Sequence, residues 1–358
     1  DPQKYQENKV AVHSDDEVPS IAIVPLKNKG DDKDIFYAYG ISTDIIKDCI
    51  GAGLIRVESL DRIEKIENYD KLDITELASK LFVRYISTGT LWKMDDIFQL
   101  SIELYDAKLS KVIWSDRWEE SWDNLPSIKG SLSDGLLKAL DTKPKVEQKV
   151  ETTNPEAYEY YLKAKHKYAK RENTDDTEIV RGLLHKAIEL DDNLIVAKDL
   201  LGWTYSTTGD YDKAMGIYTP ALKQAEKIDD KVGMRYGLNS IGVVHYYKGN
   251  YDKALDYYGR SRAILEEIGD KRGIGAILGN IGSVYSDKGD FGIALDYYER
   301  SLAIDEELGD KYGMGASLHN IGNVYNSKGD YEKVLDYLEK SLAIQKEIGI
   351  KLIELATT

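Results

Sequence analysis

The same short phrase recurs every 40 residues through the second half of this chain of 358 residues. Its first copy reads Gly209-Asp-Tyr-Asp-Lys-Ala214, and the later copies begin at Gly249, Gly289 and Gly329. In each copy a further glycine lies seven residues upstream, at positions 202, 242, 282 and 322. A fixed period of about 20–50 residues is typical of solenoids, whose stacked repeats form long surfaces that bind other chains. The pattern therefore favours an interaction protein over an enzyme.

Each stretch of 40 residues predicts two helices. The glycine of the phrase suits the left-handed stop of the first helix, and the Asp or Asn after it can cap the second. The upstream glycine and residues such as Ala254 are small enough for the two helices to cross closely. The second helices are expected to end at Gly269, Gly309 and Gly349, and Asp270 and Asp310 are expected to start the next first helices.

The array divides into repeats at residues 193–232, 233–272, 273–312 and 313–352. Residues 154–192 predict an earlier, divergent repeat, because they hold two helical segments and end in Lys186-Ala-Ile-Glu-Leu-Asp191. Residues 350–356 are expected to begin one more helix over the last repeat, which makes 353–358 a C-terminal cap fragment. Solenoid ends need such covers.

These repeats resemble tetratricopeptide repeats of the longer, 40-residue type found in kinesin light chains and in the Leu-Gly-Asn-repeat polarity adaptors. The phrase Asn320-Ile-Gly-Asn323 is close to that family's own. The resemblance implies an all-α superhelical solenoid that binds a peptide or protein along a concave groove lined by the first helix of each repeat. In the family's register the groove residues are Trp203, Tyr236, Asn239, Tyr246, Ser283, Ser286, His319, Asn323 and Asn326.

The groove lacks one known anchor of this family. Chaperone-type repeats bind a C-terminal carboxylate with a Lys followed four residues later by an Asn. The corresponding pairs here are Asp199/Trp203, Asn239/Val243, Gly279/Ser283 and His319/Asn323, and none contains the lysine. The sequence therefore argues against carboxylate binding by that mechanism. The alternative, that these residues form ordinary solvated helix faces, is left open by the sequence.

Residues 20–142 predict a mixed α/β domain. Apolar or alternating runs predict strands at 20–26, 54–58, 83–91, 97–105 and 111–118, and the last three are expected to form an antiparallel meander. Helical spacing predicts helices at 40–50, 73–81 and 125–140, with Ser42 or Thr43 capping the first and Asp73 the second. Trp92, Trp114, Trp118 and Trp122 are expected in its core. Residues 1–19 and 143–153 are polar and predict linkers.

Several of these segments resemble the TolB N-terminal-like domain. They are residues 20–26, 36–46, 83–91 and 112–118. In bacterial proteins this module often lies between a class III adenylate or guanylate cyclase domain, a kinase or a winged-helix domain and a run of tetratricopeptide repeats. The resemblance implies no catalytic residues, because the family has no agreed ones.

Two further hypotheses follow from this resemblance and from the start of the chain. The leading hypothesis remains a non-catalytic interaction segment that binds a peptide or protein. Because the chain begins at Asp1 without a methionine and residues 1–19 predict a linker, the alternative is that it is the C-terminal regulatory half of a longer cyclase or kinase whose catalytic domain lies upstream. A weaker hypothesis makes the α/β domain a small-molecule sensor.

Composition limits the kinds of partner that the chain can bind and indicates the compartment in which it works. The net charge of −15 argues against nucleic acid, and no apolar run reaches the roughly 18 residues that span a membrane. The single cysteine, Cys49, excludes an intrachain disulfide. With no visible signal peptide, we expect a cytoplasmic protein. The five histidines lack metal-ligand spacing and no catalytic motif is present, so we predict neither a metal, a cofactor nor an enzyme.

Overall fold

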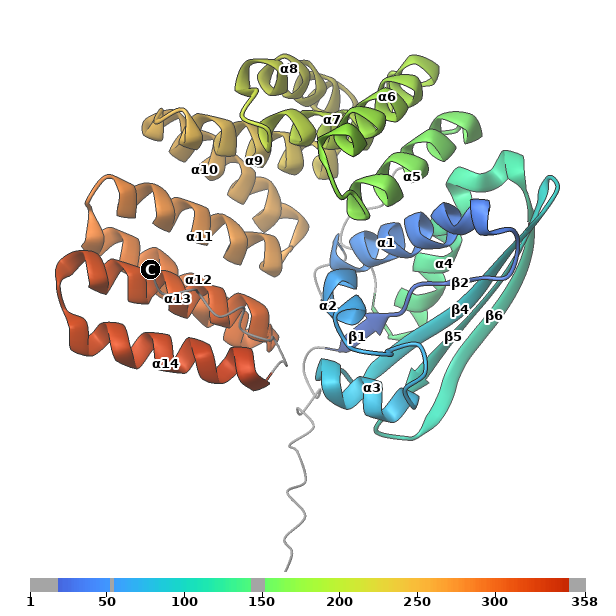
Figure 1. Ribbon diagram of the computed structural model, residues 1–358, viewed down its shortest axis with the longest axis horizontal. Helices are drawn as coiled ribbons and strands as arrows, with labels where there is room; N and C mark the ends of the chain where they lie inside the picture. The colour runs from blue at the N-terminus through green and yellow to red at the C-terminus, as the bar shows by residue number, and fades with distance from the viewer. Residues whose placement is uncertain (1–18, 52–54, 143–151, 348–358) are drawn as a thin grey trace, which may run out of the picture.

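The computed structural model describes residues 19–51, 55–142 and 152–347 (Figure 1). The predicted linkers at 1–19 and 143–153 lie almost wholly outside these residues, and so do Gly349 and the expected C-terminal helix. A mixed sheet with its helices comes first in the chain, and an arc of paired helices follows it. The predicted fold class, an α/β domain followed by an all-α solenoid, is confirmed.

The described strands form one mixed sheet. They are β1 (Ser20–Ile23), β2 (Lys27–Asn28), β3 (Arg56–Val57), β4 (Tyr85–Met94), β5 (Ile97–Asp106) and β6 (Lys111–Ser121). Their order is β3-β1-β4-β5-β6, and β2 pairs with β4. β1 runs parallel to both neighbours, whereas β4, β5 and β6 form the predicted antiparallel meander. Alternate residues of β5, from Phe98 to Leu104, are buried because one face of this strand meets the core.

The helices of this domain are α1 (Ile35–Gly51), α2 (Leu60–Glu64), α3 (Ile74–Leu81) and α4 (Leu125–Ala139). Asp73 caps α3 as predicted, since its side chain accepts a hydrogen bond from the Thr75 amide. The expected cap of α1 at Ser42 or Thr43 is wrong, because α1 begins earlier, at Ile35. Inside the helix, the Ser42 hydroxyl instead donates to the Ala38 carbonyl at 2.7 Å and accepts from the Leu26 amide at 2.9 Å. The short helix α2 was not predicted.

The tryptophans are only partly in the core. Trp92, near the end of β4, is 44% exposed, so its expected burial is wrong. Trp114 and Trp118 share one face of β6, with ring centroids 6.2 Å apart, and Trp114 packs against Gly135 of α4. Trp122 donates a hydrogen bond from Nε1 to Glu159 at 3.1 Å. Trp114, Trp118 and Trp122 are partly buried against the core, so the expectation holds for three of the four.

The solenoid consists of alternating first and second helices of each repeat, here called helices A and helices B. Helices A are α5 (Pro155–Ala169), α7 (Ile195–Ser206), α9 (Lys231–Tyr247), α11 (Lys271–Asp287) and α13 (Lys311–Lys328). Helices B are α6 (Thr174–Leu190), α8 (Tyr211–Ile228), α10 (Tyr251–Ile268), α12 (Phe291–Leu308) and α14 (Tyr331–Glu347). The repeating glycines at 209, 249, 289 and 329 have φ between 70° and 80°, which is the left-handed stop that the sequence predicts.

The caps of these helices follow the prediction in part. Asp270 and Asp310 cap α11 and α13, accepting hydrogen bonds from the Gly273 amide at 2.8 Å and the Gly313 amide at 3.1 Å. Asp210 caps α8 in the same manner, but Asn250 and Asp290 make no capping hydrogen bond. The N-cap prediction therefore holds for helices A more generally than for helices B.

The upstream glycines let helices A and B cross closely. A Cβ atom on Gly242 would lie 2.7 Å from the ring of Tyr258, and one on Gly282 would lie 2.8 Å from the ring of Tyr298. Both tyrosines are buried, so their rings fill the space that the missing side chains leave. The prediction that small residues permit the close crossing is confirmed.

Candidate functional site

Helices A pack directly against one another along one side of the array, α7 on α9, α9 on α11 and α11 on α13. Three side-chain hydrogen bonds join neighbouring helices A, each between residues 41 positions apart. They are Ser240 Oγ to Asp199 Oδ1 at 3.1 Å, Asn280 Nδ2 to Asn239 Oδ1 at 3.1 Å, and Tyr246 Oη to Asp287 Oδ2 at 2.7 Å. We call the side chains that helices A present along this side the inner face.

The last helix A of the array is the most open part of the inner face. His319, Asn323 and Asn326 of α13 are all exposed, and they lie along one stripe because their spacing of four and three residues matches helical turns. On α7, at the other end, Trp203 is 41% exposed. These four predicted residues are therefore accessible.

The predicted residues on α11 are half-buried. The Ser283 hydroxyl donates to the Gly279 carbonyl at 3.1 Å and lies 3.0 Å from the Tyr298 hydroxyl. Ser286 lies one turn further along the same helix and is also half-buried. Ser283 is thus tied to its own repeat.

The predicted residues on α9 have partners within the chain. Tyr246 donates to Asp287, and burial together with that carboxylate raises the pKa of its phenol. Asn239 accepts from Asn280, which the prediction left out, although an Asn recurs at the equivalent positions 280 and 320. Hydrogen bonds between repeats therefore use part of the predicted groove.

Tyr236 meets a residue from the other domain. The Lys47 ammonium of α1 lies 4.8 Å from the centroid of the Tyr236 ring, and the Arg235 guanidinium lies 4.1 Å from it. Burial raises the pKa of Asp199, although Lys47 and the Ser240 hydroxyl oppose the shift. Sequence reasoning missed Lys47, because nothing local links α1 to a residue almost 200 positions later. This part of the inner face is covered by the chain itself.

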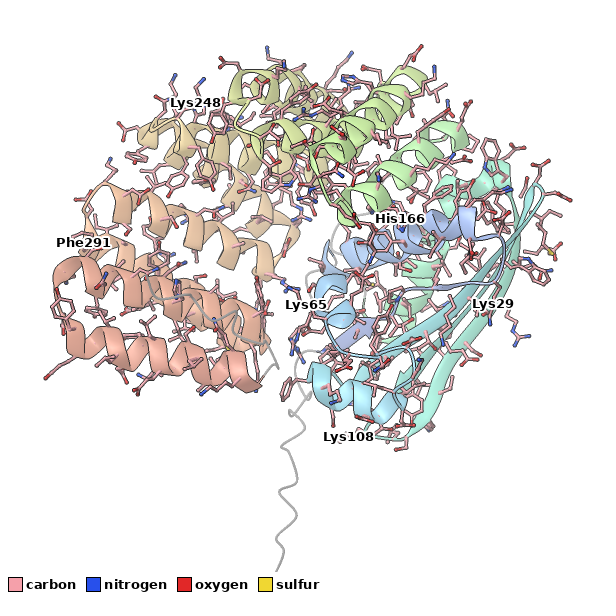
Figure 2. The ribbon with its side chains drawn as sticks, viewed as in Figure 1. Lys29, Lys65, Lys108, His166, Lys248 and Phe291 are labelled. Atoms are coloured by element: carbon pink, nitrogen blue, oxygen red, sulfur yellow. The ribbon has the colours of Figure 1, made fainter. Side chains whose placement is uncertain are left out.

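The two parts are joined firmly where α5 lies along α1 (Figure 1). A Cβ atom on Gly40 would lie 2.5 Å from the side chain of Leu162, so only glycine allows this approach. One continuous apolar core runs from β1 and α1 through α5 to α7. In Figure 2 His166 of α5 lies over α1, where its ring meets Tyr39 edge-on at 5.3 Å.

Buried polar groups reinforce this joint. Burial alone would raise the pKa of Asp44, but Lys165 and Lys129 hold it below its ordinary value. Lys165 lies 2.5 Å from Asp44, and the Tyr158 hydroxyl donates to the same carboxylate. Tyr37 likewise donates to Glu159 at 2.5 Å. Charge pairs thus align α1 with α5.

A second contact links the domains at the far end of the arc. Arg272, at the start of α11, donates from Nη1 to the Val57 carbonyl at 2.6 Å. Lys311, at the start of α13, lies 4.1 Å from the centroid of the Phe82 ring. The α/β domain therefore meets both the beginning of the array and its last helices.

Within the described residues no group of three or more His, Cys, Asp or Glu is placed to hold a metal ion. Nor does any helix in these ranges combine the length and apolar character that crossing a membrane requires. Cys49 is buried in α1, and burial raises the pKa of its thiol. The chemistry offered by the described inner face is hydrogen bonding.

Comparison with known proteins identifies the repeats. A tetratricopeptide-repeat family profile matches residues 233–307 and again 273–347, and a second tetratricopeptide-repeat profile matches residues 199–232. Residues 199–347 are tetratricopeptide repeats. Curated protein sequences give no significant match to the chain.

Solved structures with a similar fold include three repeat proteins. BtubC (BKLC) from P. vanneervenii is 19% identical with a TM-score of 0.48, over 56% of this chain and 84% of that one. A putative kinesin light chain from Podosopora anserina with nearly identical tetratricopeptide-like repeats is 14% identical with a TM-score of 0.44, over 54% and 96%. A Rap protein in complex with competence and sporulation factor is 16% identical with a TM-score of 0.47, over 61% and 59%.

Proposed function

We propose that the tetratricopeptide array is a protein-interaction module that binds an extended peptide along the inner face of α9, α11 and α13. The observation that supports this is the recurrence of uncharged polar residues at equal positions of successive helices A. Tyr246, Ser286 and Asn326 occupy one such position, and Ser283 and Asn323 occupy another. An extended peptide repeats its own amide and carbonyl groups, so a periodic row of donors and acceptors suits it.

Affinity would come from many small contacts. The array lacks the lysine of a carboxylate clamp, and Asp287, the charged group beside Tyr246, is hydrogen-bonded to it. A single hydrogen bond contributes only about 0.5–1.5 kcal/mol net, so several must act together. The net charge of −15 favours a neutral or basic partner. We place this interaction in the cytoplasm.

A regulatory role within a longer chain is the second candidate. The observation that favours it is the continuous core between the α/β domain and α5, because a partner bound to the array would act on a rigidly attached neighbour. The α/β domain resembles the TolB N-terminal-like module, which in bacterial proteins accompanies class III cyclase domains. In this proposal the array is the receiving part and the α/β domain passes the signal on.

The test begins with cross-linking capture from a lysate of the source organism and ends with a defined ligand. The bait is compared with a triple variant, Tyr246→Ala with His319→Ala and Asn323→Ala. A control triple variant, Lys223→Ala with Asp256→Ala and Glu339→Ala, removes exposed side chains from helices B. Peptides from captured proteins are then synthesised and titrated by fluorescence polarisation.

We expect a captured peptide to bind the wild type and the control equally. The inner-face variant should bind at least about tenfold more weakly, because it loses two or three hydrogen bonds. Equal affinity for all three proteins would remove the inner face as the binding site. Capture that depends on the α/β domain alone would favour the regulatory alternative.

A further inference from the structure

Besides the contact of Lys47 with Tyr236, the α/β domain touches the array at two places of different character. The first is the joint between α1 and α5, where a continuous apolar core crosses from one part to the other. The second is made by Arg272 and Lys311 of the array with Val57 and Phe82 of the α/β domain. We call this second contact the clasp, and its four residues define it.

Arg272 holds the centre of the clasp. One arm of its guanidinium donates to the Val57 carbonyl at 2.6 Å, and the other lies 2.8 Å from the carboxylate of Asp310, which caps α13. Val57 belongs to β3, the end strand of the described sheet on this side. The amides of Arg56 and Glu58 donate to Pro19 and Ile21, so the carbonyl of Val57 between them points away from the sheet's own ladder. An unpaired strand edge invites pairing with other chains, and here an arginine of the array covers it.

Charged groups surround this centre. Glu58 lies 2.8 Å from Arg56 and 2.8 Å from Arg62, and these pairs are almost buried. Burial raises the pKa of Glu58, although the positive charges of Arg62 and Arg56 lower it in part. The negative charge of Asp310, on the other side of the clasp, raises it further. The clasp therefore brings charges of both signs from the two parts together.

The clasp has no shared apolar core. Among the described residues, the cluster that combines the two parts is the one at the joint, and its array members come from α5, α6 and α7. The Val57 side chain belongs to the α/β end of that cluster, and the other buried clusters near the clasp stay within the α/β domain or within the repeats. Polar interfaces between parts of one chain behave like transient interfaces, and salt weakens them.

We propose that the clasp opens and closes while the joint stays shut. Each repeat of a solenoid contacts only its neighbours. Small changes in the angles between successive helices from α5 to α11 therefore add up to a large movement at the clasp. Arg272 lies one turn before Ala276 and two turns before Gly279, on the stripe of α11 that continues to Ser283. In the closed state the α/β domain lies against the N-terminal ends of α9, α11 and α13, through Lys47, Val57 and Phe82. These ends adjoin the proposed peptide site, so the clasp acts as an autoinhibitory contact, a role that rests on the proposed function. The opening itself is measured without a peptide, so a failure of this proposal and a failure of the proposed function are distinguishable.

Energy transfer between two dyes measures the opening in the full chain. The dyes are attached to a Lys71→Cys, Glu339→Cys protein, because both positions are exposed and the native Cys49 is buried. The clasp variant is Arg272→Ala with Lys311→Ala. The matched control is Lys271→Ala with Lys340→Ala, which removes the same charge from ion pairs with Glu307 and Asp336 inside the array.

We expect high transfer in the wild type at low salt and a progressive loss as salt is added. The clasp variant should show the low-transfer state already at low salt, while the control follows the wild type. Transfer that is insensitive to salt in the wild type overturns the proposal, even where the clasp variant fails to fold. Equal transfer in the wild type and in a clasp variant whose folding is verified by circular dichroism overturns it as well.

An Arg272→Lys protein keeps the positive charge but cannot contact Val57 and Asp310 at the same time with two arms. We expect it to open at lower salt than the wild type.

Discussion

The guanidinium of Arg272 donates a hydrogen bond of 2.6 Å to the backbone carbonyl of Val57, 215 positions earlier in the chain. This bond ties the start of α11 to the edge strand of the sheet, so the array curves back onto the domain that precedes it. Neither residue belongs to a motif. The contact exists because the curvature of successive repeats brings α11 to the sheet (Figure 1).

We expect two glycines in neighbouring helices to respond oppositely to alanine. Gly242→Ala should lower the free energy of unfolding by about 1–3 kcal/mol, because its Cβ would lie 2.7 Å from the Tyr258 ring. Gly259→Ala in α10 should raise it by about 0.5–1 kcal/mol, because no atom lies within 4 Å and alanine favours the helix. Urea unfolding of both variants checks this. Equal effects of the two changes would contradict the close crossing as the cause.

Removing Lys165 should weaken the joint. Lys165→Met leaves the buried Asp44 carboxylate without its nearest cation, so we expect a loss of about 3 kcal/mol in the free energy of unfolding near neutral pH. The control is Lys186→Met, whose ion pair with Glu189 is exposed and screened by solvent, so this change should alter the free energy of unfolding much less. Adding Asp44→Asn to Lys165→Met should recover part of the loss. A double variant as unstable as the single one would show that the charge is not the cause.

Asp305 makes the stability depend on pH. Burial raises its pKa to about 7, and the nearby Asp310 adds to the shift. In the unfolded state Asp305 has its ordinary pKa of 3.8 and loses its proton above that pH, whereas the folded state keeps the proton up to about pH 7. The contribution of Asp305 to the free energy of unfolding therefore falls as pH rises from about 4 to about 7.

Asp305→Asn should remove this dependence, because the amide oxygen can still accept from Ser317 at 3.1 Å without carrying charge. We expect the variant to match the wild type near about pH 4 and to exceed it near about pH 8, by on the order of 1 kcal/mol. Chemical unfolding across that range measures the difference. A gap that stays constant with pH would show that Asp305 does not titrate there.

The array should depend on the α/β domain for its first helix. Tyr158, Tyr161 and Leu162 of α5 are buried in the shared core and would be exposed in a fragment that begins at Thr152. We expect this fragment to lose hydrogen-exchange protection in α5 and to melt below the intact protein. The later helices, α9 to α12, should keep their protection, because their apolar clusters lie within the repeats. A fragment in which α5 is fully protected would contradict the shared core.

Part of the candidate site follows from the sequence alone. The stripe on α13, from His319 to Asn326, was predicted from the register of the family that the repeats resemble, and it is exposed. Tyr236 and Asn239 were predicted on the same basis, but Lys47 and Asn280 already contact them. The period describes which way a side chain points within its own repeat. It carries no information about what another domain places in front of it.

The amino-acid sequence by itself determined the repeats of this protein. Glycines such as Gly249 stop a helix by their own φ, and Gly242 permits the crossing with Tyr258 only sixteen positions later, so both effects are local and recur with the period. The tertiary structure alone decided the closure of the array onto the sheet, through Lys47, Arg272 and Lys311. These contacts depend on small rotations summed over many repeats, and no short segment of sequence encodes that sum.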